Sequence, residues 1–477
     1  MELDIAGMVD GAPSDVTTAQ RLERLQKHTD AWRRRAFETV EELPCHEAHM
    51  VQLSGKVLAR CIGNSTLAFN LLPGHARGVP AKEWRFENVG FPIAEYAVDP
   101  AQDLVVILSG LSGAAGGAVP LSQAPMIYLW SLSTGVPHPL AAETELVFPP
   151  GLVYDMERRF KLFLTGDILG VEFRASDGGP CKHLIAWSWK SGTMCLWING
   201  DCLLLAPSQT TGCAPRIFAN VIDTRRVYSH PVSWGGDEYC CAFEYPFYEH
   251  RYLSWKIQWL SSSSERADEG LFHSLPSDEC VVVEMSYGKI GFPAPEEDVD
   301  DGHGEHHLNL THIIPATVIL SRIQKHTISH PDSQKVWRWE EWGAARTFMT
   351  GPFQSFGRAF CRQSISAYRF IEWPIPVYPA EPREGLARNM AELYDFNTWR
   401  FRRAPREDGL ELHAVTTRDK GLWINHAQFL ECAKVDFRLP PLMTRYKGYQ
   451  WDLAISEDNV VLFYDNYPHT ECYVMSI

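Results

Sequence analysis

The hydrophobic positions of this chain fall mostly in short runs that are separated by Gly, Pro, Asn and Asp. Residues 95–110 show the pattern clearly, because an apolar run leads into an Asp-Pro turn and a second apolar run follows. Two strands joined by a tight turn have this pattern. Similar arrangements recur at residues 49–62, 161–173 and 451–464. The sequence therefore predicts a chain built largely of antiparallel hairpins.

The spacing of these hairpins indicates a ring of sheets. The turn at residues 190–192 holds the same place after a strand-like run as the turn at residues 133–135, and the offset is a little above the roughly 40–50 residues of common propeller repeats. Each unit has two fairly apolar faces, so neighbouring units must stack on one another. An irregular β-propeller meets this need, because closing the ring leaves only short sheet edges. The repeat is weak after Pro231, so the blade number is not predicted.

One long helical pattern precedes the strands, at residues 17–37. Thr17 and Gln20 have the spacing of a capping box, which marks a helix start. The apolar face predicted for this helix consists of Leu22, Leu25 and Trp32. The predicted fold class is therefore mainly β, an irregular β-propeller preceded by one N-terminal α-helix.

The domain organisation follows from the same patterns. We expect an N-terminal linker helix within residues 1–42 and a β-propeller-like domain over residues 43–477. Three polar or irregular stretches predict loop insertions in that domain, near residues 261–270, 293–307 and 381–409. The last of these includes a short predicted helix at residues 385–394.

Composition narrows the classes of partner. The chain is 45% hydrophobic and 22% charged, which is a normal globular balance. Its formal net charge of −15 argues against a nucleic-acid or anionic-membrane surface, because such partners require clustered Lys and Arg. Twelve cysteines without a CxxC pair favour reduced thiols. With no signal-peptide pattern and no apolar run long enough to cross a membrane, we expect a cytoplasmic or nuclear protein.

The densest group of metal-ligand side chains does not predict a metal site. These residues are His303, Glu305, His306, His307 and His312. A helical zinc motif places two histidines four residues apart on one rigid face, whereas this group lies in a stretch rich in Pro, Gly and acidic residues. A solvated acidic loop is the better interpretation, and we expect no metal and no cofactor.

Sequence motifs do not support an enzyme either. The chain has no GxSxG nucleophile elbow, no GxxxxGK[ST] phosphate loop and no GxGxxG after a strand. Carboxylate pairs such as Glu340 and Glu341 are expected by chance among 59 acidic residues. We therefore predict a non-enzymatic protein with no catalytic residues, and a propeller-fold hydrolase remains a less favoured alternative.

Tryptophans provide the candidate recognition residues. Trp130, Trp187 and Trp189 lie within strand-like runs, where packing against the next sheet is the ordinary role. Other tryptophans lie in less regular sequence beside arginines, and these two residue types often carry binding energy. The predicted partner-binding residues are Trp337, Arg338, Trp339, Trp342, Arg346, Trp399 and Arg400.

Three stretches of the chain, in this order and spacing, resemble a large family of F-box proteins from mushroom-forming (basidiomycete) fungi. They are residues 3–33, the pair of runs AVDPAQDLVVIL and IYLWSLSTGVPHPL, and WRWEEWGAARTF at residues 337–348. The resemblance implies a WD40-like β-propeller region behind an F-box. It also implies a substrate receptor of an SCF-type ubiquitin ligase, in which the F-box binds the Skp1 adaptor and the propeller selects the target.

The chain departs from this family at its N-terminus. The first eleven residues, MELDIAGMVDG, resemble the tail of the last F-box helix, and the only Leu-Pro pair nearby, Leu43 and Pro44, follows the linker helix. We expect the F-box to be missing, so binding to a Skp1-type adaptor is in doubt. The leading interpretation is a protein-recognition module that holds an unidentified protein target, and the alternative is a stand-alone β-propeller scaffold without a ubiquitin link.

Overall fold

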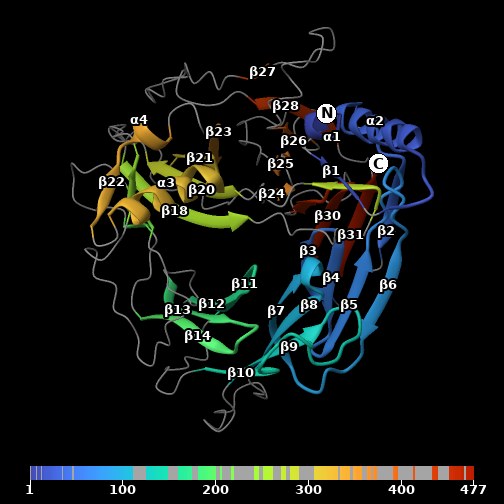
Figure 1. Cartoon of the computed structure of the whole chain (residues 1–477), viewed down its shortest axis with the longest axis horizontal. Helices are drawn as coiled ribbons and strands as arrows, with labels where there is room; N and C mark the ends of the chain where they lie inside the picture. The colour runs from blue at the N-terminus through green and yellow to red at the C-terminus, as the bar shows by residue number, and fades with distance from the viewer. Residues whose placement is uncertain are drawn as a thin grey trace, which may run out of the picture.

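The structure is a computed structural model of the chain, drawn in Figure 1. It describes residues 2–6, 8–11, 13–34, 36–43, 45, 48–110, 125–148, 159–174, 181–199, 205–206, 216–219, 241–245, 251–260, 270–274, 280–288, 306–330, 333–343, 347–356, 363–366, 369–372, 390–395, 412–413, 432–438, 451–466 and 469–477.

The first three sheets each use four consecutive strands in an antiparallel meander. The first contains β3 (Ala48–Ser54), β4 (Val57–Ile62), β5 (Thr66–Leu71) and β6 (Lys82–Phe86). The second contains β7 (Ile93–Asp99), β8 (Leu104–Ser109), β9 (Met126–Ser131) and β10 (Glu145–Val147). The third contains β11 (Arg159–Thr165), β12 (Ile168–Arg174), β13 (Cys181–Ser188) and β14 (Thr193–Asn199).

The next three sheets depart from this simple order. One contains β15 (Leu205–Ala206), β16 (Arg216–Ala219), β17 (Cys241–Glu244) and β22 (Lys335–Trp337). Another contains β18 (Arg251–Leu260), β20 (Cys280–Gly288), β21 (His306–Pro315) and β23 (Phe348–Phe356). A third has five strands, β24 (Gln363–Ser366), β25 (Arg369–Glu372), β26 (Met390–Asp395), β28 (Cys432–Arg438) and β27 (Leu412–His413).

The last sheet closes the ring. It contains β29 (Trp451–Ile455), β30 (Asn459–Asn466) and β31 (His469–Ser476), and its outermost strand is β2 (Thr39–Leu43) from the start of the chain. The register joins Thr39 to Ser476 and Leu43 to Cys472. Figure 1 shows these sheets arranged around a common centre. The chain is therefore a mainly β protein, an irregular WD40-like β-propeller, and the described strands form seven sheets of four or five strands.

The hydrophobic core lies between adjacent sheets, as two-faced apolar strands require. One buried cluster joins the first sheet to the second, with Phe69 on β5 packed in the same cluster as Tyr96 on β7. The next cluster joins the second sheet to the third and includes Trp187 and Trp189, which are 2% and 0% exposed. Core packing of these two tryptophans is therefore confirmed. Trp130 is partly buried against the first of these clusters.

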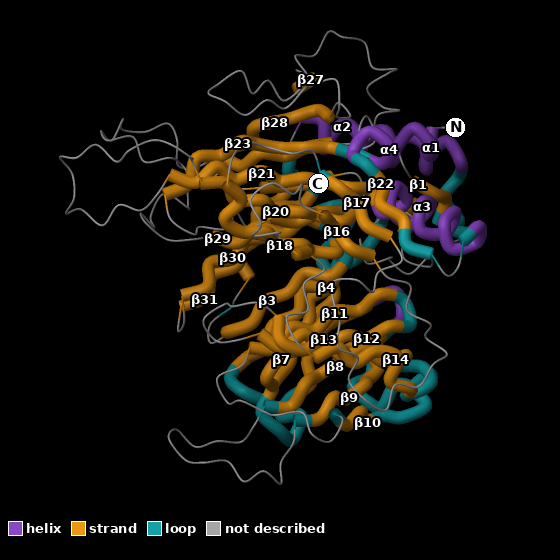
Figure 2. Tube along the Cα trace, turned by 90° about the vertical axis from the view of Figure 1, so that its left-hand side faces the viewer, coloured by secondary structure: helices purple, strands orange, loops and turns teal. Residues whose placement is uncertain are grey.

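Four α-helices are described, and all lie toward one face of the ring, the right-hand side of Figure 2. They are α1 (Glu2–Ala6), α2 (Thr18–Arg34), α3 (Ala316–Ser329) and α4 (Trp339–Trp342). A short strand after α1, β1 (Met8–Asp10), pairs with β19 (Phe272–Ser274), which belongs to the connection between β18 and β20. The N-terminal segment is therefore fixed to the propeller. Within the residues that the structure describes, no helix is long and apolar enough to span a membrane.

The capping box predicted for α2 is present. The Thr17 backbone N–H donates to Gln20 Oε1 at 2.9 Å, and the Gln20 N–H donates to Thr17 Oγ1 at 3.3 Å. The predicted apolar face is wrong at Leu22, which is 39% exposed, because His28 takes the third buried position beside Leu25 and Trp32.

Other boundaries also differ from the sequence prediction. Residues 39–43 are strand β2 of the propeller, so the propeller begins before residue 43. Met390–Asp395 is strand β26 where a helix was predicted, because pairing with β25 and β28 overrides local propensity. Most of the insertions predicted near residues 261–270, 293–307 and 381–409 lies outside the described residues.

Candidate functional site

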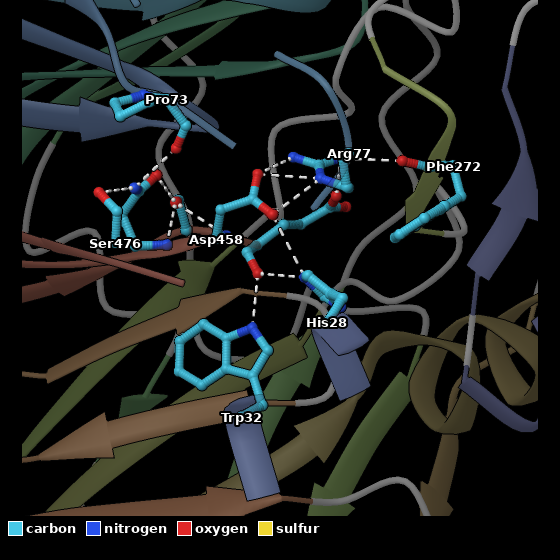
Figure 3. Close-up of polar contacts among 10 residues, drawn as sticks. His28, Trp32, Pro73, Arg77, Phe272, Asp458 and Ser476 are labelled. Atoms are coloured by element: carbon cyan, nitrogen blue, oxygen red, sulfur yellow. Dashed lines mark hydrogen bonds and ion pairs between the residues drawn. The ribbon is translucent and has the colours of Figure 1, made fainter. Parts of the chain in front are cut away.

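The most concentrated buried charge in the described structure lies where α2 meets the ring-closing sheet. We call it the closure cluster and define it as His28, Arg77, Glu457 and Asp458, shown in Figure 3. His28 comes from α2, Arg77 from the connection between β5 and β6, and the two carboxylates from the turn between β29 and β30. All four residues are at most 5% exposed. Burial of this much charge requires close pairing.

The turn that carries the carboxylates is fixed by its own hydrogen bonds. The Ser456 N–H donates to the Asn459 carbonyl at 2.8 Å, and the Asn459 N–H donates to Ser456 Oγ at 3.0 Å. Asn459 Nδ2 also donates to the Pro73 carbonyl at 2.9 Å and to Ser476 Oγ at 2.8 Å. These bonds hold the turn against the β5–β6 connection, which supplies Arg77.

Arg77 neutralises the carboxylates. Its Nε lies 3.0 and 2.9 Å from the two Asp458 carboxylate oxygens, and its Nη1 forms an ion pair with Glu457 and donates to the Phe272 carbonyl at 3.0 Å. Burial alone would raise the pKa of Asp458, but the Arg77 charge and the hydrogen bonds from His28 and Arg77 hold that pKa well below its ordinary value. Asp458 is therefore ionised throughout the neutral range.

His28 contributes as a neutral donor. Burial lowers its pKa more strongly than the Asp458 carboxylate raises it. Its Nε2 lies 3.1 Å from the Glu457 carbonyl and 3.2 Å from Asp458 Oδ1. Trp32 Nε1 donates to the same Glu457 carbonyl at 2.8 Å, so two side chains of α2 bind the β29–β30 turn.

The geometry of the closure cluster is structural rather than catalytic. His28 and Asp458 resemble part of a hydrolase dyad, but His28 Nε2 faces a carboxylate and a carbonyl instead of a nucleophile. The four residues bring together α2, the β5–β6 connection, β19 and the β29–β30 turn, and their burial leaves no surface for a substrate. The sequence predicts the hairpin at residues 451–464 but not this cluster, because Arg77 and Asp458 lie 381 positions apart.

The structure brings four of the predicted recognition residues together beside an insertion. Between β21 and β23 the chain forms α3, then β22, then α4. Strand β22 does not join the sheet of β21 and β23, which flank it in the sequence. It pairs in parallel with β17 of the preceding sheet instead, and it ends in Trp337. Arg338 follows at the start of α4, and Trp339 and Trp342 are in α4.

Two of these tryptophans form a buried aromatic cluster with Tyr245 and His312. Trp339 and Trp342 are 2% and 0% exposed. Tyr245 stacks on Trp339 with ring centroids 5.7 Å apart and meets Trp342 edge to face at 5.3 Å. Trp342 Nε1 donates to the Glu244 carbonyl at 3.0 Å. These rings position the insertion, and a partner on the surface would not contact them directly.

The other predicted recognition residues have different positions. Arg338 is exposed, and its backbone N–H donates to Glu341 Oε2 at 2.9 Å. Trp337 is half-buried, with Lys335 Nζ 5.1 Å from its ring centroid. Arg346, Trp399 and Arg400 lie outside the described residues. Partner binding by this group stays a prediction.

Within the part of the chain that the structure describes, no group of three or more His, Cys, Asp or Glu side chains could hold a metal ion. His303 and Glu305 lie outside that part. His312 is fully buried, and its Nδ1 lies 2.6 Å from the Tyr245 hydroxyl. Burial lowers the pKa of His312 to about 3. The imidazole is therefore neutral and belongs to the aromatic cluster.

Comparisons with known proteins leave the family open. No protein-family model matches the chain, and no curated protein matches it. Similar solved structures include the computationally designed Ika8 protein, which is 10% identical over 91% of this chain and 98% of that chain, with a TM-score of 0.35. Hsv2 from Kluyveromyces lactis is 10% identical over 88% of this chain and 91% of that chain, with a TM-score of 0.34.

The WD40 domain of SCAP from fission yeast is also similar, with 9% identity over 98% of both chains and a TM-score of 0.31. These scores are low, so the fold assignment depends on the strand pairing of the chain itself. The seven described sheets and their closure by β2 and β31 place the chain among the WD40-like β-propellers.

Proposed function

We propose that the protein is a non-enzymatic recognition module that holds a protein partner on the helix-bearing face of its propeller. The observation that carries the proposal is the insertion of α3, β22 and α4. Its inner side is held by the buried aromatic cluster, whereas Arg338, Glu340 and Glu341 are exposed on its outer side. A rigid base beneath exposed charged residues suits selective protein binding, because little side-chain and backbone order is lost when the partner docks.

The insertion is also well fixed to the ring. Arg322 of α3 donates from Nη2 to the Glu341 carbonyl at 2.6 Å, which joins α3 to α4. Strand β22 pairs with β17 of one sheet, and the strands on either side of the insertion, β21 and β23, pair with each other in the next sheet. The insertion is therefore attached to two neighbouring sheets. We infer that Arg338 and Trp337 make the direct contacts, and that Trp339 and Trp342 position them.

We further propose that the held partner is a substrate of a cullin-based ubiquitin ligase, in the cytoplasm or the nucleus. The resemblance of residues 3–33 and 337–348 to the fungal F-box proteins supports this finer proposal. The protein would act by proximity, since a target held on the propeller is kept at high effective concentration near the ligase. Its own side chains would carry out no chemistry.

Affinity capture with matched variants tests the recognition function. Tagged full-length protein, the variant Arg338→Glu and the control Arg85→Glu would be incubated with fungal extract, and retained proteins would be quantified by mass spectrometry. Arg85 is a suitable control because it is exposed on β6, in a different sheet. We expect at least one protein to be retained by the wild type and the control and lost from Arg338→Glu. Identical retention by all three would contradict the assignment of this surface.

The ubiquitin link has a separate readout. If it holds, the cellular half-life of the captured partner lengthens when the gene for this chain is deleted or the proteasome is inhibited. Retention of the partner with an unchanged half-life would favour a stand-alone scaffold.

A further inference from the structure

Two cysteines that are far apart in the sequence meet at the point where the ring closes. Cys45 follows β2 by two residues, and Cys472 lies on β31 opposite Leu43. Both belong to one buried core cluster, with exposures of 2% and 0%. The two thiols share a side-chain hydrogen bond, and both are free. Their sulfur atoms are therefore neighbours without being joined.

A buried guanidinium lies beside this pair. Arg60 of β4 is 2% exposed, and its Nη1 lies 3.6 Å from Cys45 Sγ. The hydrogen bond from Cys472 and the charge of Arg60 lower the pKa of Cys45, whereas the same thiol contact and burial raise the pKa of Cys472. Of the two sulfurs, Cys45 is therefore the one that loses its proton more readily. Attack by a thiolate is the first step of thiol oxidation.

We propose that Cys45 and Cys472 form a reversible disulfide when the protein meets a peroxide, and that this bond locks the propeller ring closed. The site differs from an ordinary pair of core cysteines because of its place in the chain. Cys45 lies in the link between β2, the outer strand of the last sheet, and β3, the first strand of the first sheet. A bond to β31 would fasten this link covalently.

The chemistry balances with hydrogen peroxide as the oxidant. The Cys45 thiolate attacks one peroxide oxygen, the O–O bond breaks, and the departing hydroxide takes up a proton to give water. Cys45 is then a sulfenic acid. The Cys472 sulfur attacks the Cys45 sulfur, the S–S bond forms, the S–O bond breaks, and hydroxide leaves with the Cys472 proton as a second water. The two thiols together lose two electrons, and the peroxide gains them.

Access to the buried sulfurs comes from the edge of the sheet. Among the described strands, β2 pairs only with β31, and Val40, Glu41 and Glu42 on it are exposed. Edge strands of this kind open locally at a lower free energy than the core. Brief opening of β2 admits a small peroxide, and a dithiol reductant reverses the bond by the same route.

The test uses purified, reduced, full-length protein and hydrogen peroxide. After treatment the protein would be denatured, its free thiols alkylated, and its peptides analysed by mass spectrometry. We expect a cross-linked peptide that contains Cys45 and Cys472 and disappears with dithiothreitol. Cys61 serves as the internal control, because burial raises its pKa to about 12 and it should remain a thiol. Alkylation of Cys45 and Cys472 to the same extent as Cys61 would overturn the proposal.

Thermal unfolding tests the locking effect. A disulfide that closes a loop of several hundred residues is expected to raise the apparent Tm by about 4 °C in a chain of this size. The rise should vanish with dithiothreitol and be absent from Cys45→Ser and Cys472→Ser, whereas Cys61→Ser should keep it. An unchanged or lowered Tm in the oxidised wild type would refute the lock, and this comparison does not depend on the folding of any variant.

Discussion

Arg77 is surrounded by protein on every side, with two carboxylates beside its guanidinium. Replacing one member of a buried ion pair leaves its partners charged in a medium that solvates them poorly. We expect Arg77→Met to lower the free energy of unfolding by about 3–5 kcal/mol, measured by urea unfolding. The control Arg85→Met removes an exposed ion pair with Glu87 and should change that free energy by no more than about 0.5 kcal/mol.

A double variant separates charge from packing in the same experiment. In Arg77→Met with Asp458→Leu, one buried carboxylate is removed together with the guanidinium. We expect its loss of unfolding free energy to be smaller than the sum of the two single losses. Strictly additive losses would show that the pair is not coupled.

His312 gives the protein a pH-dependent stability of predictable sign. Its pKa is lowered to about 3 in the folded protein, against an ordinary value of 6.5. The unfolded chain therefore binds a proton below pH 6.5 that the folded chain does not, and stability falls as the pH falls. We expect His312→Gln to remove about 2 kcal/mol of the decrease in unfolding free energy between pH 7 and pH 5. An unchanged slope would contradict the neutral buried imidazole. His28 acts in the same direction.

At the scale of elements, local hairpins were predictable from the sequence, and pairing between strands of different units was not. The hairpin of β7 and β8 follows from two apolar runs, with Asp99 capping the turn by accepting from the Ala101 N–H at 3.0 Å. The parallel pairing of β22 with β17 has no such pattern, because each strand has only three or four residues and the partners come from different units. Nor does helical spacing show that His28 is buried, since its partner Asp458 is supplied from elsewhere in the fold.

The burial of the predicted recognition residues could not be read from the sequence, for the same reason. Sequence favoured Trp339 and Trp342 as binding residues, yet Tyr245 and His312 cover them, and neither contact can be read from residues near them in the sequence. Arg338, between Trp337 and α4, is exposed, and its part in partner binding stays a prediction.

The start of α2 permits a clean test of a local prediction. Thr17 and Gln20 satisfy each other's backbone N–H groups and are both exposed. We expect Thr17→Ala to lower the free energy of unfolding by about 1 kcal/mol, because the Gln20 N–H loses its acceptor. Thr18→Ala, one residue later and also exposed, should have a smaller effect or none. Equal effects of the two substitutions in urea unfolding would count against the capping box.

At the scale of the whole molecule, the pairing of β2 with β31 joins residues 39–43 to the last strand of the chain in one sheet. Deleting residues 1–43 removes β2 together with the two side chains of α2 that bind Glu457. We expect the midpoint of urea unfolding to fall by about 1 M or more, with a larger radius in small-angle scattering. Deleting residues 1–15 leaves Thr17, α2 and β2 in place and should have a much smaller effect. Similar midpoints for both deletions would show that closure contributes little.

Ring closure also sets the order in which the protein can mature on the ribosome. The partner of Thr39 is Ser476, so β2 must wait for nearly all of the propeller to be synthesised before it finds its place. Until then the earlier sheets form an open arc whose two end sheets each expose an apolar face. During this interval the exposed apolar faces favour association with other nascent chains, and a ribosome stalled before β31 would leave a product that cannot close.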